Sequence, residues 1–255
     1  MVAHAPHQSS RDLAERLGAR ADVCQVVANR PISTSLREIV LHGDVRLAGV
    51  PGQDVMVRVP GGDHHVRRRY SVRRVDRDAH RFTLWISVDH DGPGSVWARE
   101  VEPGSFVDVV GPRGKITLRE ADWHLFVGDV TGIAAFYRLA ESIEVPGRAL
   151  FVIEVDHDDD ALTAPFDEGL GVTGVFVDRR DRGRDDPAGL LSGLAALSLP
   201  DGEGRAYLAG EFHVVRAVRA ALSERGLGDD AVKHKAYFRL GRANAEHGEP
   251  DKRDD

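Results

Sequence analysis

The sequence predicts two consecutive domains, an antiparallel Greek-key β-barrel followed by a parallel α/β domain. Before residue 111, short apolar segments bounded by Gly, Pro and Asp recur at roughly ten-residue spacing, which is typical of a small barrel. After residue 121, continuous apolar runs alternate with helical patterns, which indicates a parallel sheet buried on both faces. A chain of 255 residues has room for both domains.

The first domain is expected to span residues 21–118, after a flexible segment at residues 1–20. Leu13 and Leu17 share one helical face, so residues 12–17 of that segment have a short-helix pattern. A further helix is expected at residues 96–101, with Ser95 as its N-cap. The barrel strands are expected at residues 23–28, 36–43, 55–59, 70–75, 82–88 and 106–110.

The second domain is expected to span residues 119–242. A helix opening at Asp129 follows its first strand, and a helix over 211–225 follows its fourth. The tail at residues 243–255 is charged and lacks large apolar side chains, so it is expected to be disordered. The strands are expected at residues 123–128, 149–155, 172–177, 206–210 and 233–240.

Composition narrows the class of protein. The formal net charge is −7, which argues against a nucleic-acid partner, and no apolar run approaches the ~18 residues of a membrane span. The N-terminus lacks the pattern of a signal peptide, so a cytoplasmic location is expected. Cys24 is the only cysteine, which excludes an internal disulfide. His157 to Asp160 follow a strand and are expected to form a solvated loop, so no metal site is predicted.

An arginine-rich segment lies inside the barrel region. Strand alternation places Arg68, Tyr70 and Val72 on one face, and Arg67, Arg69, Ser71 and Arg73 on the other. Tyrosine stacks on flat rings and arginine binds phosphate through paired donors. The pattern fits a ligand with a planar ring and an anionic tail, and the alternative is a solvated basic strand edge.

Two motifs carry a family resemblance. The segment from Arg68 to Arg73 resembles the Arg-x-Tyr-Thr/Ser flavin motif of ferredoxin-reductase-like flavoproteins. The segment from Asp89 to Ala98 is similar to the His-Gly-x-Gly-Pro-Ala-Ser-x-Trp-Ala stretch of siderophore-interacting proteins, which are FAD-binding and ferric-siderophore-reductase-like. The resemblance covers about residues 23–242. This chain departs from the family pattern directly after the histidine, where it lacks the family's Gly.

The resemblance implies an FAD site in the barrel. Arg68 would meet the pyrophosphate, and Tyr70 and Ser71 would flank the isoalloxazine within a motif that continues through Val72 and Arg73. The ribityl and phosphate groups would be held by His90, Gly92, Pro93, Gly94 and Ser95, where N–H groups at a helix start suit a phosphate. Trp97 is either a cofactor contact or a core residue.

The resemblance also implies an NAD(P)H site in the second domain. Residues 128–135 stand where the family has Gly-Asp-Glu-Thr-Ala-x-Pro-Ala, and Asp129 and Thr131 match. Val130 replaces the family's Glu, and Gly210 and Glu211 match a later Ala-Gly-Glu. The alternative is ordinary strand-to-helix turns, which any α/β fold needs. No residue chooses between NADH and NADPH.

Substrate preference is expected to differ from the family's. Met56 stands nearest the family's Lys, and Leu240 replaces its second C-terminal Arg. The remaining substrate-binding candidates are Arg58, Lys235 and Arg239, alongside Met56. A less basic pocket favours an aromatic or quinone-like organic substrate over a ferric siderophore, although both remain open.

The predicted function is FAD-dependent NAD(P)H oxidation coupled to reduction of a substrate. An organic substrate would need a proton donor near the flavin, and His65, His90 and Tyr70 are the catalytic candidates. The alternative is a protein that retains FAD for non-redox, cyclase-like catalysis or as a scaffold. The mixed-charge stretch at residues 179–186 is expected to be a flexible surface loop.

Overall fold

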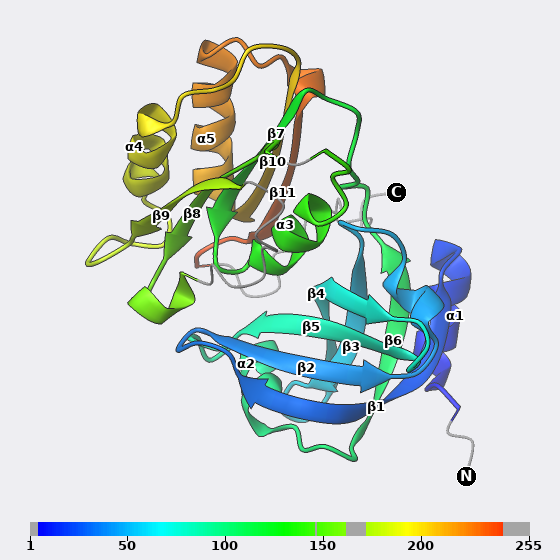
Figure 1. Cartoon of the computed structure of the whole chain (residues 1–255). Coiled ribbons are helices and arrows are strands. Elements are labelled where there is room, and N and C mark those ends of the chain that lie inside the picture. The colour runs from blue at the N-terminus through cyan, green and yellow to red at the C-terminus, as the bar shows by residue number, and fades with distance from the viewer. Residues whose placement is uncertain (1–4, 146, 162–171, 242–255) are drawn as a thin grey trace, which may run out of the picture. The chain divides into compact units, whose positions relative to one another are not determined.

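The computed structural model describes residues 5–145, 147–161 and 172–241. The chain divides into two compact units, Met1–Thr117 and Leu118–Asp255, here called the barrel unit and the parallel-sheet unit (Figure 1). The predicted tail at residues 243–255 lies outside the described residues.

The barrel unit is a closed antiparallel barrel in which the strand order is β1-β2-β5-β4-β3-β6. This order confirms the predicted Greek-key barrel. A short α2, Pro93–Glu100, lies between β5 and β6, and a 3-10 turn η1, Val45–Ala48, lies between β2 and β3. The strands are β1 Arg20–Pro31, β2 Leu36–His42, β3 Asp54–Pro60, β4 His65–Asp76, β5 Arg81–Ser87 and β6 Phe106–Arg113.

Strand alternation builds the barrel core. Val55, Val57 and Val59 of β3 point inward and are fully buried, while Met56 and Arg58 between them are half-buried. From α2, Trp97 and Ala98 pack into the same core. The helix is therefore fixed to the barrel by its apolar side, which positions its N-terminus against β4.

The N-terminal helix α1 is longer and better anchored than expected. It spans Gln8–Leu17 and packs on β1 and β6. Ser10 Oγ donates a hydrogen bond to Asp108 (2.7 Å), and Arg67 donates to Ser9 Oγ (2.8 Å). The expectation of a loose segment therefore fails for these residues, because Asp108 and Arg67 supply polar partners that the local sequence does not reveal.

The parallel-sheet unit has five strands in the order β11-β10-β7-β8-β9. Its strands and helices alternate as predicted, with one helix, α4, that the sequence did not reveal. The elements are β7 Trp123–Asp129, α3 Ile133–Ala140, β8 Ala149–Val155, η2 Asp158–Asp160, β9 Thr173–Asp178, α4 Ala188–Ala196, β10 Gly204–Glu211, α5 Phe212–Glu224, η3 Asp229–Ala231 and β11 Val232–Phe238.

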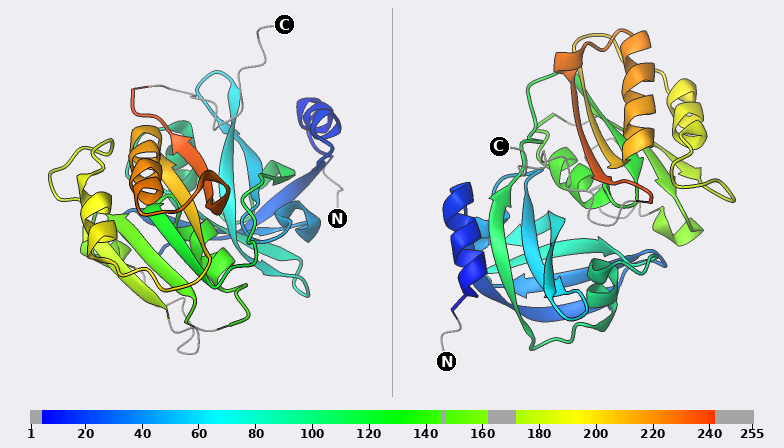
Figure 2. Two further views of the ribbon diagram at one scale, coloured as in Figure 1. Left: turned by 90° about the horizontal axis from the view of Figure 1, so that it is seen from above. Right: turned by 180° about the vertical axis from the view of Figure 1, so that it is seen from behind.

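Alternate residues of the central strands serve two cores. Phe126 on β7 packs against Phe151 on β8, Tyr207 on β10 and Phe136 of α3. On the opposite face, aliphatic side chains of the same strands pack against α4 and α5. Figures 1 and 2 show α4 and α5 together on one face of the sheet and α3 on the other. The sequence predicted apolar strands that are buried on both faces of the sheet. This prediction is confirmed, because β7 and β8 are buried throughout.

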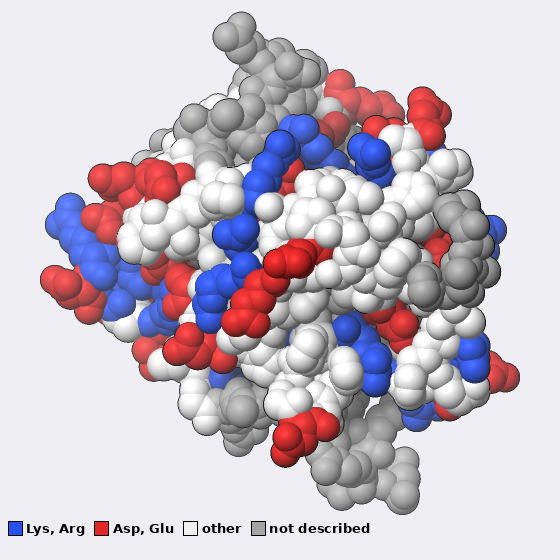
Figure 3. Space-filling view, turned by 90° about the horizontal axis from the view of Figure 1, so that it is seen from below, with Lys and Arg blue, Asp and Glu red and all other residues white. Residues whose placement is uncertain are grey.

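Charge on the surface is mixed. On the face drawn in Figure 3, acidic and basic side chains lie interspersed. Among the described residues, no helix has both the length and the apolar character that crossing a membrane would require.

Candidate functional site

The start of α2 packs directly on the arginine and tyrosine of β4. A Cβ placed on Gly94 would collide with Tyr70 Oη and lie 3.2 Å from Arg68 Cγ. The Tyr70 ring stacks on that of Trp97, with 6.1 Å between centroids and 24° between planes. Two stretches more than 20 residues apart, both singled out by the sequence, are therefore brought together.

The phenol of Tyr70 has an unused donor. Its Oη is buried, and no hydrogen-bond partner for it exists among the described residues. Burial raises the pKa of Tyr70, and the nearby charge of Arg68 opposes that rise only in part. The phenol thus keeps its proton at neutral pH and can donate it to an acceptor atom of a ligand. An orphaned buried donor of this kind is costly unless a ligand satisfies it.

The α2 N-terminus carries no side-chain cap. The N-cap is Gly92, and Pro93 follows as the first helical residue. The predicted cap, Ser95, is instead buried and donates to the Ser87 carbonyl (2.7 Å), because the helix begins earlier than expected. His90 Nε2 lies 2.9 Å from Ser95 Oγ, which ties the loop to the helix. A helix start with no capping side chain suits an anionic ligand group.

The arginines at positions 67–69 of β4 do not all lie next to Tyr70 and the start of α2. Arg69 pairs with the buried Asp54 (2.8 Å), and Arg67 bonds to α1. Both arginines lie on the face that alternation assigns to them, and both serve the barrel unit. Arg68 is left on the face of Tyr70, where burial lowers its pKa.

Val72 and Arg73 correct the predicted cofactor set. Val72 is fully buried in the barrel core, and Arg73 is fully buried with its guanidinium 4.8 Å from the ring centroid of Trp85. Neither side chain is exposed on the surface of the barrel unit. The cause for Arg73 is a register shift between Val72 and Arg74, where a bulge interrupts the alternation that the sequence argument assumed.

A cavity of about 630 Å³ opens beside Trp97. Trp97 and Pro93 of α2 form one wall, and the hairpin between β3 and β4 contributes Arg58 and His65. Phe106, which is 50% exposed, contributes an apolar surface from β6. The cavity thus combines aromatic walls with a cation, an imidazole and the carboxylates of Asp91, Glu100 and Asp108.

In the parallel-sheet unit, the turn after β7 faces the end of β10. Asp129 is buried and accepts hydrogen bonds from the backbone N–H of Thr131 (2.9 Å) and from its hydroxyl (2.5 Å). Gly210 has φ +143°, and a Cβ there would lie 2.8 Å from Asp129 Oδ2. The chain leaves β7 for β8 and β9 on one side and returns as β10 on the other. Ligands of open parallel sheets bind at such a switch point.

Glu211 has a structural role in this unit. Its carboxylate accepts hydrogen bonds from the backbone N–H groups of His213 and Val214 at the start of α5, and from that of Leu240. It is fully buried. Capping of α5 accounts for Glu211 in the matching Ala-Gly-Glu motif, and its contact with a cofactor stays a prediction.

The substrate-binding candidates are spread over both units. Met56 pairs with Arg69 across the barrel strands, and Arg58 lines the cavity. Lys235 lies over the Tyr237 ring at 5.2 Å, and the Arg239 guanidinium lies over the Phe212 ring at 4.9 Å. Leu240 is 50% exposed, so the apolar replacement of the family's Arg lies at the surface.

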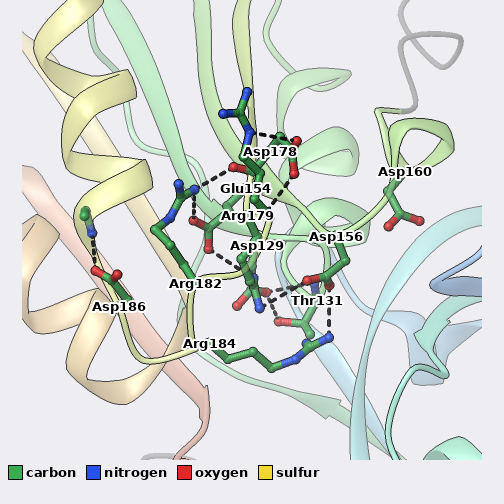
Figure 4. Close-up of polar contacts among 12 residues, drawn as sticks. Asp129, Thr131, Glu154, Asp156, Asp160, Asp178, Arg179, Arg182, Arg184 and Asp186 are labelled. Atoms are coloured by element: carbon green, nitrogen blue, oxygen red, sulfur yellow. Dashed lines mark hydrogen bonds and ion pairs between the residues drawn. The ribbon is translucent and has the colours of Figure 1, made fainter.

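The sequence missed an ion-pair cluster at the carboxyl ends of β8 and β9 (Figure 4). Arg179 is buried and pairs with Glu154 (3.1 Å) and Asp156 (3.3 Å). The expectation that residues 179–186 form a flexible surface loop is therefore wrong at Arg179. The signal for this cluster in the sequence is the high density of arginines just after a strand end. Because acidic residues alternate with these arginines, the stretch has the pattern of a solvated loop. The predicted solvated loop at Asp158–Asp160 is a 3-10 turn in which Asp160 is buried.

Comparisons with known proteins agree with this architecture and its motifs. The model described as siderophore-interacting FAD-binding domain matches residues 51–116, and the model described as siderophore-interacting protein matches residues 121–241. The fold is that of two-domain, ferredoxin-reductase-like flavoproteins. The chain belongs to the siderophore-interacting protein family, and its barrel unit carries an FAD-binding domain.

Individual relatives are of the same kind. Ferric vibriobactin reductase ViuB of Vibrio cholerae is 28% identical over 182 residues, which cover 69% of this chain and 66% of that protein, just under two thirds of its length. A siderophore utilization protein from T. fusca is 26% identical, with a TM-score of 0.77 over 90% of this chain and 96% of that one. The siderophore-interacting protein SipS from Aeromonas hydrophila, 24% identical, shares the fold with a TM-score of 0.73 over 89% of this chain and 94% of its own.

Proposed function

We propose that the chain is an FAD-dependent NAD(P)H oxidoreductase that reduces a ferric siderophore. The observation that carries the proposal is the contact of Gly94 with Tyr70 and Arg68, with the unpartnered Tyr70 Oη at its centre. These residues fit FAD, because a planar ring can pack beside Tyr70 while a pyrophosphate meets Arg68 and the uncapped start of α2. Family membership and the likeness to ferric vibriobactin reductase support the same assignment.

When bound, FAD would accept a hydride and transfer electrons. The chain's own residues position and shield it. Tyr70 donates its phenol proton as a hydrogen bond, Arg68 neutralises phosphate charge, and Trp97 holds the tyrosine ring in place. In the parallel-sheet unit, the turn from Asp129 to Thr131 fits the nicotinamide cofactor, because it lies at the switch point of the sheet.

A ferric chelate needs no proton donor, since its reduction moves an electron alone. His65 and His90 are therefore not required as acids for this substrate. His65 lines the cavity, and His90 is hydrogen-bonded to Ser95.

A second candidate substrate is a quinone-like organic molecule. The observation that favours it is Leu240, which is half-exposed where the family has a cation. For this substrate a proton donor is required, and His65 in the wall of the aromatic cavity is the side chain that we propose for it.

The test begins with anaerobic titration of the FAD-loaded protein by NADH and by NADPH, followed by addition of a ferric siderophore or a quinone. Loss of the flavin absorbance that is restored by the ferric chelate supports the proposal. Restoration by quinone alone supports the second candidate. A flavin that neither nucleotide bleaches would overturn both and favour the non-redox alternative.

A variant pair sharpens the choice of substrate. Leu240→Arg restores the family's cation and is expected to raise kcat/KM for an anionic ferric chelate roughly threefold or more through electrostatic attraction. The matched control is Val145→Arg, because Val145 is similarly exposed (45%, against 50% for Leu240) in the same unit. Equal gains in both variants would show a general effect of charge and no role for position 240.

A further inference from the structure

Two arginines face each other across neighbouring strands of the barrel unit. Arg58 of β3 and Arg67 of β4, here called the arginine pair, are direct partners in the register of the two strands. Directly opposed residues of an antiparallel pair share one face of the sheet, with their Cβ atoms about 5 Å apart. Because like charges at such positions destabilise a sheet, the fold alone gives no reason for this pairing.

The side chains of the arginine pair have no acidic partner. Among the described residues, Arg58 makes no side-chain hydrogen bond or ion pair, and the guanidinium of Arg67 bonds only to serine hydroxyls of α1, at 2.8 Å from Ser9 Oγ. Arg69 lies on the same face of β4 and differs in this respect, since it pairs with Asp54 at 2.8 Å. The barrel thus neutralises one arginine of this face and leaves two without a carboxylate.

The carboxylate of Asp108 is engaged by α1. Its Oδ2 accepts a hydrogen bond from the backbone N–H of His7 (2.9 Å) and another from the Ser10 hydroxyl (2.7 Å). Burial lowers the pKa of Arg67, the charge of Arg58 lowers it further, and Asp108 opposes them only in part. The arginine pair therefore carries more positive charge than its surroundings neutralise, although the net charge of the chain is −7.

The cavity beside Trp97 contains two further carboxylates, which do not reach the arginine pair. Asp91 and Glu100 line this cavity together with Arg58, yet neither forms an ion pair with it in the part of the chain that the structure describes. Arg67 does not line the cavity and bonds instead to α1, which packs on β1 and β6 (Figure 1). The arginine pair thus lies between the rim of the cavity and the start of α1.

We propose that the arginine pair binds a phosphate group, in a site separate from the FAD site. A guanidinium binds phosphate through two parallel hydrogen bonds, and two guanidiniums on adjacent strands can hold a tetrahedral oxyanion from two sides. A phosphate group between Arg58 and Arg67 replaces one repulsion by two attractions. Arg68, which we assign to FAD, lies on the opposite face of β4 from Arg67. The group is either free phosphate or part of a small organic phosphate.

Calorimetric titration of the FAD-loaded chain with inorganic phosphate measures the binding. In a phosphate-free buffer whose ionic strength is held constant with NaCl, we expect binding that saturates. Arg58→Gln should weaken it at least about tenfold, the size of one charge-assisted hydrogen bond. Arg58→Lys keeps the charge without the paired donors and should lie between the two.

Phenyl phosphate distinguishes the two sources of the group. Arg58 lines the same cavity as Trp97 and the half-exposed Phe106, so an aromatic ring attached to the phosphate has apolar surface within reach. Tighter binding of phenyl phosphate than of inorganic phosphate would show that the ligand is an organic phosphate that extends into the cavity. Equal affinities, both lost in Arg58→Gln, would show that the ligand is free phosphate.

Urea unfolding tests the repulsion itself. In phosphate-free buffer at low salt, Arg58→Gln should unfold at a higher urea concentration than wild type, because it removes one of two facing charges. Added phosphate should raise the midpoint of wild type and leave that of Arg58→Gln unchanged. Arg30→Gln is the matched control, because Arg30 faces Glu38 across β1 and β2 and donates to it at 2.8 Å. This variant should gain no stability and should bind phosphate as wild type does.

Three results would overturn the inference. The first is phosphate binding that does not saturate in wild type, or that is equally strong in Arg58→Gln. The second is phosphate binding that occurs only without FAD, which would place the anion in the FAD site. The third is a loss of stability in Arg58→Gln without phosphate, which would show that Arg58 has a favourable partner in the fold. None of these results bears on the proposed function, because flavin reduction by NADH or NADPH is measured without phosphate.

Discussion

The Tyr70 ring stacks on the Trp97 ring with 6.1 Å between their centroids, so a strand and a helix share one aromatic pair. Trp97 is buried in the barrel core, while the Tyr70 phenol oxygen is buried without a partner among the described residues. The pair therefore joins a core residue to one with an unused donor. Trp97 is confirmed as a core residue, and its contact with a cofactor stays a prediction.

Tyr70→Phe is expected to separate stability from FAD binding. Removing the orphaned hydroxyl should raise the stability of the FAD-free protein by about 1 kcal/mol, because a buried unsatisfied group is lost while the ring remains. FAD affinity should fall, since the donated hydrogen bond is lost. Urea unfolding and fluorescence titration with FAD measure the two effects. A variant that loses stability without FAD would show that Oη has a partner in the fold.

Gly94→Ala tests the close approach of α2 to β4. The added Cβ collides with Tyr70 Oη, so the variant should lose about 1–2 kcal/mol of stability through overpacking. In the Tyr70→Phe background the collision is relieved, and the same substitution should cost less. The double-mutant cycle should therefore show a clear coupling energy. Additive effects of the two changes would contradict the contact.

Arg68 and Arg69 are neighbours with different expected effects. Arg69→Ala removes an ion-pair partner from the buried Asp54 carboxylate and should cost about 3 kcal/mol of stability. Arg68→Ala should change stability far less and weaken FAD binding at least about tenfold, because it removes a charge-assisted contact to phosphate. Chemical unfolding and FAD titration of both variants decide the assignment. The opposite pattern would place the phosphate contact on Arg69.

The sequence predicted the fold class and most elements because these follow from periodicity. Val55, Val57 and Val59 alternate as a half-buried strand must, and β7 and β8 are apolar throughout as strands covered on both faces must be. Helix α4 escaped prediction because it carries Gly189 and Gly193, which weaken a helical pattern. Packing requires Gly193, because a Cβ there would lie 2.7 Å from Val152 Cγ1.

The site was predictable where a motif sits on a regular strand, and not where the backbone departs from regularity. Arg68 and Tyr70 lie as alternation demands, whereas the bulge at Arg73 turns that side chain into a buried stack on Trp85. Glu211 matched a family motif, yet its carboxylate caps α5. Long-range ion pairs such as Arg179 with Glu154 join residues of different strands, and no local pattern reports them.

Asp129→Asn should make the stability of the chain less sensitive to pH. Burial raises the pKa of Asp129 above its ordinary value of 3.8, and the Thr131 hydrogen bonds oppose that rise only in part. The folded chain therefore binds a proton at Asp129 more readily than the unfolded chain does. The stability that this protonation contributes is complete below the pKa of Asp129 in the unfolded chain. It is lost as the pH rises through the pKa of Asp129 in the folded chain. Asn cannot ionise, but its carbonyl oxygen can still accept the Thr131 bonds.

The stability of Asp129→Asn relative to wild type should thus increase as the pH rises above about 4, with little difference at the acid end. Urea unfolding at several pH values measures this trend, provided that both proteins unfold in comparable steps. Asp229→Asn is the control, because that carboxylate is 77% exposed and its removal should give a nearly constant difference. A flat difference for Asp129→Asn would mean that the positive charges of Arg179 and Arg184 and the Thr131 hydrogen bonds compensate the burial of this carboxylate in full.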